Sequence, residues 1–434
     1  MQKITTLLCV VCLALVAQSA VAGFKLADDK ITIGLNARIR YEFFNNTDFT
    51  TTTNDTRDYF LTRLRPTFSF LPHEQVEVVF EPQFTGGWGE ILGTSQTSVN
   101  AASAASSSGN LDDPTLGVHQ GYLKYKPTDW YEMTLGRQVL AYGDQVLIGA
   151  VDWNNTGRSF DAFKSRFSGE NFWIDAVYTL LSDTESSAGR GACAAPCTFG
   201  DHHFGGVYAS INAAEWLKEL DFYAFYRFDS VGQPPRAHNY AIAGTRLKGA
   251  TGIFDYRFET TAEYGKSTIS GANNNQRDWQ TDAELGVTFK EAANFRIGVE
   301  ALAASKNFIQ MFPTAHKWLG YVDLFGRRNI MSGVLRLSAK PSEKWLMTLD
   351  AHTIMRYSNT LGLYALNGTT AIGAVGTSTS KFGGEEIDLT ASFKPLDILS
   401  FDMGLGTFLP MGFVKTNVGN DPTLFGYLQT GVRF

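Results

Sequence analysis

The stretch Phe254–Tyr264, FDYRFETTAEY, determines the kind of protein that this chain forms. Aromatic and small apolar residues alternate along it with Asp255, Arg257, Glu259 and Glu263, which is the period of two that a β-strand imposes on its two faces. One face of the strand is therefore apolar and the other is charged. Because a membrane barrel turns its apolar faces to lipid and its polar faces to its lumen, this pattern favours a membrane barrel over a soluble β-sandwich.

The same alternation recurs from residue 31 to the end of the chain. It predicts an all-β fold, a transmembrane antiparallel β-barrel of about 18 strands with short periplasmic turns and long extracellular loops. The final residue, Phe434, closes an alternating strand, as in other outer-membrane barrels. The predicted strands span residues 30–44, 57–71, 74–85, 116–127, 129–140, 158–168, 171–181, 203–212, 220–229, 238–249, 252–265, 279–290, 294–303, 329–339, 344–356, 382–394, 398–410 and 421–434.

The N-terminal residues 1–22 have the features of a secretory signal peptide. Lys3 precedes the apolar run Leu7–Ala17, and Ala20–Ala22 forms a small-residue cleavage site. Residues 23–434 are then a single barrel domain located in the bacterial outer membrane. Without Lys3 the chain has 36 basic and 43 acidic residues, since 37 − 1 = 36, a net charge of −7 that disfavours binding to nucleic acid.

Two cysteines remain after the signal peptide, Cys193 and Cys197. In an exported protein this close spacing predicts a disulfide within one loop. A zinc site that adds His202 and His203 is the alternative, but the spacing of the cysteines is loose for such a site. We therefore predict a disulfide and no metal.

The segment Met133–Phe167 combines two alternating stretches with a connector rich in charge and glycine. A loop that folds back to narrow a channel needs such a composition, because its buried charges must pair while its backbone turns sharply. Strict alternation would turn Arg137 toward lipid, so we expect a bulge that brings it inward. The charged residues assigned to this inward loop are Arg137, Asp144, Asp152, Arg158 and Asp161.

The motifs LGRQ, YGD, LIG, DW and GRSFDA occur in this order within Met133–Phe167 and resemble the alginate-export family of outer-membrane barrels. A second block, Phe312–Phe325, resembles the PT-x-H-K segment of that family. The resemblance implies a monomeric barrel whose arginine-lined pore passes a polyuronate. It also implies contact with outer-membrane lipid and lipopolysaccharide and delivery of cargo by a periplasmic protein.

Strand parity places many charges in the predicted lumen. Arg38 and Arg40 share one strand, and Arg63 and Arg65 share the next, so these four residues could form a ladder of guanidinium groups that favours the passage of carboxylates. Ion pairing that only stabilises a wide lumen is the competing interpretation for each of these side chains. Three further inward arginines belong to the predicted site: Arg166, Arg257 and Arg356. Parity also turns Arg227, Arg246, Arg296 and Arg336 inward.

The function predicted from these residues is an outer-membrane channel for anionic solutes, either small anions or an anionic polysaccharide. A general diffusion porin for small ions and sugars is the first alternative, and a scaffold barrel around a partner protein is the second. A barrel hydrolase is disfavoured because only His352 among the seven histidines falls on a strand at inward parity and no Ser, His and acid constellation is evident. No motif for a cofactor occurs, so none is predicted.

Overall fold

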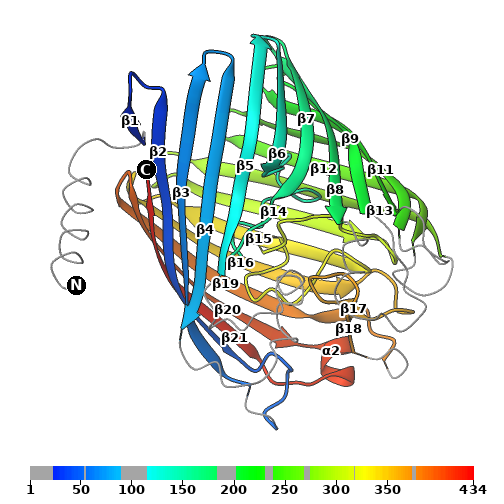
Figure 1. Cartoon of the computed structure of the whole chain (residues 1–434). Coiled ribbons are helices and arrows are strands. Elements are labelled where there is room, and N and C mark those ends of the chain that lie inside the picture. Colours follow the sequence, from blue (N-terminus) through cyan, green and yellow to red (C-terminus); the bar gives the residue numbers. More distant parts are fainter. Residues whose placement is uncertain are drawn as a thin grey trace, which may run out of the picture.

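The strands of the computed structural model form one continuous antiparallel wall (Figure 1). The structure describes residues 23–52, 55–88, 115–182, 202–229, 238–267, 274–316, 318–373 and 378–434. Eighteen strands close into a barrel, because the last strand pairs with β2 from Asn36↔Arg433 to Asn45↔Leu424. The short strand β1 extends the sheet to 19 strands by pairing with β2. The predicted all-β barrel and its number of strands are thus confirmed.

The barrel strands follow one another around the wall in chain order. The elements are β1 (Phe24–Leu26), β2 (Ile31–Asn45), β3 (Arg57–His73), β4 (Val76–Trp88), β5 (Thr115–Thr128), β6 (Tyr131–Gln138), β7 (Phe160–Ser168), β8 (Phe172–Ser182), β9 (His202–Ile211), β10 (Leu217–Asp229), β11 (His238–Thr251), β12 (Phe254–Ser267), β13 (Asn274–Phe289), β14 (Phe295–Ala304), β15 (Ile330–Ala339), β16 (Trp345–Arg356), β17 (Leu363–Tyr364), β18 (Ala371–Ile372), β19 (Phe382–Leu396), β20 (Leu399–Pro410), α2 (Gly412–Asn417) and β21 (Thr423–Arg433). Strands β17 and β18 form a separate small sheet.

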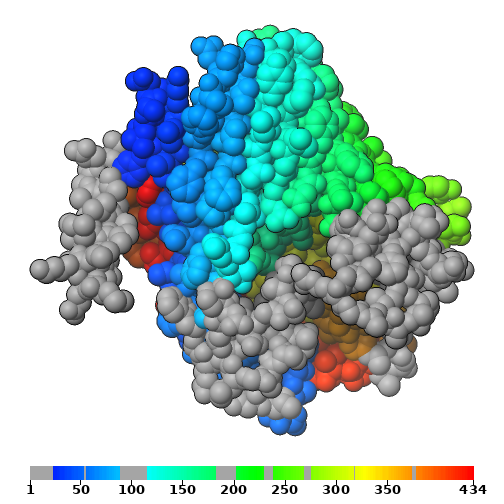
Figure 2. Space-filling view, viewed as in Figure 1, coloured from blue at the N-terminus to red at the C-terminus, as the bar shows by residue number. Residues whose placement is uncertain are grey.

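Strand β12 shows how alternation orients side chains across the wall. Its Arg257, Glu259 and Glu263 are buried, while Phe254 and Tyr264 are exposed on the outer surface. Other exposed apolar side chains, including Leu285 of β13 and Leu428 of β21, also lie on the outside of the wall. Figure 2 shows one side of this outer surface, on which strands coloured from blue to green follow one another. The polarity is therefore that of a barrel in lipid, with charge inside.

The connectors alternate in length around the barrel. Short turns join β3 to β4, β5 to β6, β11 to β12 and β19 to β20, and longer connectors join the strands at the opposite end. The C-terminus lies at the short-turn end, because Arg433 donates its backbone N–H to Ile398 O in the turn between β19 and β20. Among the described residues, no helix is both long and apolar enough to cross a membrane.

Two long connectors fold into the lumen instead of extending from the rim. We call residues 139–159, between β6 and β7, loop A, and residues 305–316 with 318–329, between β14 and β15, loop B. Their apolar side chains are buried against inward-facing residues of the wall, as with Phe308 and Phe325, which are not exposed at all. The hydrophobic core of this protein therefore lies inside its barrel.

Candidate functional site

Loops A and B are joined to each other by their backbones. Ile148 and Phe312 form a parallel β-bridge. Phe312 donates its N–H to Leu147 O at 2.7 Å and accepts the N–H of Gly149 at 2.8 Å. The two most characteristic sequence blocks, far apart along the chain, thus build one structural unit within the lumen.

Loop A crosses the lumen from one side of the barrel to the other. At one end, the carboxylate of Asp144 contacts Arg246 of β11 and Arg257 of β12. At the other end, Asp152 contacts Arg63 and Arg65 of β3. Strands β3 and β12 lie nine steps apart along the eighteen strands of the wall, since 12 − 3 = 9. The loop therefore divides the lumen near its diameter, as expected for a constriction.

Four of the arginines of β2 and β3, Arg38, Arg40, Arg63 and Arg65, bind the chain of loop A. All four are buried, with 1 to 6 % of each residue exposed. Each of them donates to a backbone carbonyl oxygen of the loop, which carries partial negative charge. The contacts are Arg38 Nη1 to Asp152 O (2.8 Å), Arg38 Nη2 to Asn154 O (3.0 Å), Arg40 Nη1 to Trp153 O (2.8 Å), Arg63 Nη1 to Asp152 O (3.0 Å) and Arg65 Nη2 to Thr156 O (2.9 Å).

The Asp152 side chain adds a carboxylate to this cationic wall. Its Oδ1 lies 3.0 Å from Arg63 Nη1 and 2.7 Å from Arg65 Nη1. Although partial burial opposes ionisation, the two guanidinium groups lower the pKa of Asp152 below its ordinary value. The carboxylate therefore remains charged near neutral pH. It is 58 % exposed, whereas the side chains of the two arginines that hold it are 2 and 4 % exposed.

The backbone of loop A takes conformations that allow these contacts. Val151 has φ of 50°, which is rare for a β-branched residue. Gly157 has φ of 67°, and a Cβ at this position would lie 2.5 Å from Arg65 Nη2. Glycine is therefore required at residue 157, because a side chain there would push the guanidinium group away from Thr156 O.

Trp153 fixes loop A against loop B and the wall at once. Its ring stacks on His316 with a centroid separation of 3.6 Å, and the Arg40 guanidinium carbon lies 3.8 Å from the ring centroid. His316 also contacts Asp323 Oδ2 through Nδ1 at 2.7 Å. This stack of guanidinium, indole and imidazole joins residues from three separate parts of the chain.

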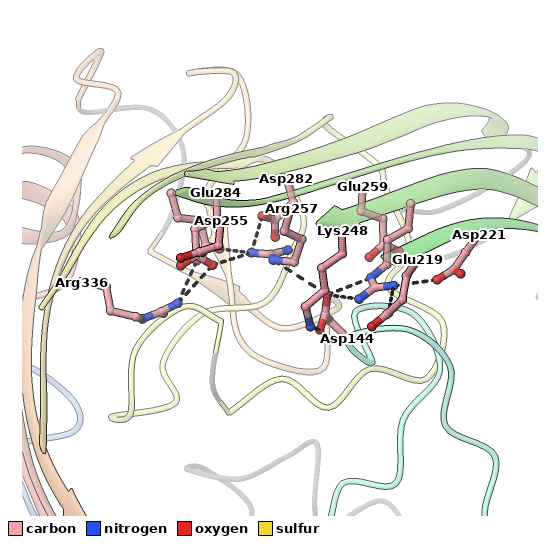
Figure 3. Close-up of polar contacts among 12 residues, drawn as sticks. Asp144, Glu219, Asp221, Lys248, Asp255, Arg257, Glu259, Asp282, Glu284 and Arg336 are labelled. Carbon is pink, nitrogen blue, oxygen red and sulfur yellow. Dashed lines mark hydrogen bonds and ion pairs between the residues drawn. The ribbon is translucent and has the colours of Figure 1, made fainter. Parts of the chain in front are cut away.

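A network of alternating charges extends along the opposite wall from Asp144 (Figure 3). Arg246 binds Asp144, Glu219 and Asp221, and it is 1 % exposed. Arg257 then contacts Asp282 at 2.9 Å and continues the network toward β13 and β14. The remaining ion pairs of the network are Lys248 with Asp144, Arg257 with Asp144, Glu284 and Glu300, Arg336 with Glu284, Glu300 and Asp350, Arg296 with Asp255 and Glu284, and Arg327 with Asp282.

We expect Asp144 to stabilise the fold at neutral pH and to lose this effect in acid. Burial alone would raise the pKa of Asp144, but the hydrogen bond and charge of Arg246, with Lys248 and Arg257, lower it from 3.8 to about 2. A carboxyl group whose pKa is lower in the folded state stabilises the fold at pH values above its unfolded-state pKa. This stabilisation is lost as the pH falls through the folded-state pKa. The contribution is about 2 kcal/mol and should vanish between about pH 4 and pH 2.

The measurement is urea unfolding of wild type and Asp144→Asn in lipid vesicles from pH 7 to pH 2. The difference in unfolding free energy should shrink toward zero at the acid end. Asp129→Asn is the control, because Asp129 is fully exposed in a short turn. A difference for Asp144→Asn that did not change with pH would contradict the assignment.

Arg137 and Asp161 do not belong to the inward loop, so their predicted placement is wrong. Strands β6 and β7 stay in register through the pair Arg137↔Asp161. Both side chains lie on the outer face with Leu135, and they form an exposed ion pair at 2.8 Å. The expected bulge is absent from β6, so strict alternation holds through Arg137.

The other predicted site residues have distinct positions. Arg158 donates to Pro313 O in loop B, and burial lowers the pKa of Arg158 to about 10. Arg166 faces the lumen on β7 and forms two hydrogen bonds with Asp175. Arg356 at the end of β16 is fully buried and donates to carbonyl oxygens of the following connector, including Leu361 O. Cys193 and Cys197 lie outside the described residues, as does the predicted signal peptide.

Arg246 and Arg327 are site residues that the predicted site omits. Alternation places Arg246 of β11 on the inward face, but the predicted site did not include it. Arg327 lies in loop B, where no alternating pattern exists, and its Nη1 donates to Gln280 at 2.9 Å. Only the folded loop brings it to the wall.

The alginate-export family model matches residues 29–426, nearly the whole described chain. The chain belongs to the alginate-export family. Its family and its barrel fold together identify this alginate-export family barrel as an outer-membrane channel. No curated protein compared with it gives a significant match.

Solved structures with the same fold are outer-membrane barrels of Pseudomonas aeruginosa. OccK11 (OpdR) is 12 % identical, with a TM-score of 0.60 and coverage of 96 % of this chain and 99 % of that chain. OccD3 (OpdP) is 11 % identical, with a TM-score of 0.59 and coverage of 97 and 96 %. The outer membrane protein OprD is 12 % identical, with a TM-score of 0.58 and coverage of 96 % of each chain. At these identities the similarity establishes the fold of the alginate-export family barrel.

Proposed function

We propose that this alginate-export family barrel passes carboxylate-bearing solutes, such as uronates, by passive diffusion past the arginines of β2 and β3. The observation that carries this proposal is the excess of guanidinium groups on one wall of the constriction. Arg38, Arg40, Arg63 and Arg65 face two carboxylates within ion-pair distance, Glu42 and Asp152.

Burial of these arginines does not remove their electrostatic effect on the passage. Much of their hydrogen bonding goes to carbonyl oxygens, which orient the guanidinium groups without cancelling a full unit of charge. The exposed carboxylate of Asp152 shows that solvent reaches the edge of this wall. A passing anion therefore meets a positive potential there, and the loop narrows the space in which salt can screen it.

The overall charge of −7 expected for the mature chain does not decide selectivity. It includes the rim, the loops and the acidic wall of β10–β16, whereas permeation depends on the charge at the narrowest level. The acidic wall is partly compensated, because many of its carboxylates pair with Arg246, Arg257, Arg296 and Arg336, whereas Glu259 and Glu263 accept hydrogen bonds from the neutral Tyr223 and Gln276. The two walls are thus different in character, one with a cationic excess and one with carboxylates in excess.

The test is the double replacement Arg63→Gln with Arg65→Gln. Two unit charges at about 6 Å from a permeating ion each contribute roughly 0.7 kcal/mol at the dielectric constant of water. Their loss should disfavour chloride about ten-fold and favour potassium about ten-fold, so the chloride-to-potassium permeability ratio should fall about a hundred-fold at low salt. Reversal potentials across a planar bilayer under a KCl gradient measure this ratio. The effect should weaken in high salt, because the passage is wet.

A matched control is Arg137→Gln, which removes a guanidinium group from the outer face of the wall. This variant should keep the wild-type permeability ratio. The proposal predicts that wild type prefers chloride over potassium. A cation-selective wild type, or a double variant with unchanged selectivity, would favour a general diffusion porin instead.

A further inference from the structure

The carboxylate of Asp152 binds Arg63 and Arg65 of β3 in the way that a solute carboxylate would. One oxygen, Oδ1, accepts a hydrogen bond from Arg65 Nη1 at 2.7 Å and lies 3.0 Å from Arg63 Nη1. The other, Oδ2, accepts from Arg63 Nη2 at 3.3 Å. The guanidinium groups are buried, but more than half of the Asp152 side chain is exposed. This is the exposure expected of a ligand at the mouth of a site.

Loop A does not depend on this carboxylate for its attachment. Arg38 donates to the carbonyl oxygens of Asp152 and Asn154, and Arg40 donates to that of Trp153. The Trp153 ring is in addition held between Arg40 and His316. These contacts use backbone or aromatic groups, so they persist when the side chain of residue 152 moves or is replaced.

The local backbone is strained in a way that places the carboxylate. Val151, immediately before Asp152, has φ of 50°, a conformation that a β-branched residue rarely adopts. Its N–H is fixed by Thr314 Oγ1 of loop B at 3.0 Å. Loop B thus helps to hold the turn that presents Asp152 to Arg63 and Arg65.

We propose that Asp152 is an internal competitor for a carboxylate-binding site formed by Arg63 and Arg65, and that the carboxylate of a uronate displaces it during passage. This inference rests on the proposed function and extends it by naming the site and its regulating group. The exchange substitutes one carboxylate for another on the same donors, so the arginines remain paired throughout. Solutes that lack a carboxylate cannot make this exchange.

The competitor explains how a channel can recognise carboxylates without trapping them. A free pair of buried guanidinium groups would hold a polyanion tightly and slow its release, because charge-assisted bidentate contacts are strong. With Asp152 tethered nearby, each departing carboxylate is replaced at high effective concentration. Affinity falls while selectivity for the carboxylate group is kept.

The experiment measures block of ion current by trigalacturonate in planar bilayers for wild type, Asp152→Asn and Asp152→Glu. The concentration for half block should fall about ten-fold in Asp152→Asn, since the tethered competitor is removed, and blocking events should last longer. Asp152→Glu retains the charge and should resemble wild type. Maltotriose, which has no carboxylate, should give the same response in all three proteins.

Asp161→Asn is the matched control. Its side chain is also 58 % exposed and paired with an arginine, but it lies on the outer face of the wall. It should not alter the block. Tighter block in Asp152→Asn alone supports the inference, and unchanged or weaker block in that variant overturns it, whichever ion the wild type prefers. Cation selectivity of the wild type would contradict the proposed function separately.

Discussion

Arg246→Ala should lower the free energy of unfolding by about 3 to 5 kcal/mol, because it leaves the buried carboxylate of Asp221 without its cation and removes one of the cations that hold Asp144. Arg246 lies 2.8 Å from Asp144, 2.6 Å from Glu219 and 2.7 Å from Asp221. Asp221 is 2 % exposed and keeps a hydrogen bond from Tyr208, but it would lose its ion-pair partner. Alanine supplies no donor for any of the three acids.

Urea unfolding of protein refolded into lipid vesicles measures this change. Arg246→Lys should lie between wild type and Arg246→Ala, since an ammonium group keeps the charge but cannot reproduce the fork of donors. Lys126→Ala is the control, because its pair with Asp129 in a short turn is exposed and such pairs contribute roughly 0 to 1 kcal/mol. Equal losses for Arg246→Ala and Lys126→Ala would show that the network of Figure 3 has little effect on stability.

Strand alternation is sufficient to predict the wall of this barrel. In β12, every second residue from Arg257 to Glu263 is buried in the lumen, because lipid excludes charge from the other face. The same alternation places Arg137 outside with Leu135, where its charge is paired with Asp161, and the prediction of a bulge that turns it inward was wrong. The register of the paired strands therefore decides on which face a charged side chain lies, even where this leaves the charge on the outside.

The arrangement of the loops inside the lumen cannot be predicted from strand alternation. The meeting of Ile148 with Phe312 joins two connectors with no shared periodic pattern. The partners of Arg38 and Arg40 are mostly carbonyl oxygens, which every residue carries and which sequence therefore cannot identify. The sequence indicates that loop A folds inward, but only the structure shows that it covers the arginines.

Excision of loop B should produce the largest change in conductance. Asn329 donates its N–H to Ser305 O at 2.9 Å, so the two ends of loop B already lie together. A short Gly-Ser linker can therefore replace residues 306–328 without forcing β14 and β15 apart. Loop A would also lose its bridge to Phe312 and the stack of Trp153 on His316. An 18-stranded wall without this filling encloses a wide aqueous channel, so single-channel conductance in KCl should rise about five-fold.

The excision should also shift selectivity toward cations, which distinguishes it from simple widening. Residues 306–328 contain four basic residues, Lys306, Lys317, Arg327 and Arg328, and one acidic residue, Asp323, so 4 − 1 = 3 positive charges are removed. Asp282 then loses Arg327, and Glu386 loses the N–H of Val322. Both carboxylates would face the enlarged passage. Insertion of the same linker in the turn after Gly252 controls for the linker itself and should leave conductance and reversal potential unchanged. Wild-type conductance after the excision would mean that ions pass outside the space that loop B fills, and the constriction would then have to be placed elsewhere along the lumen.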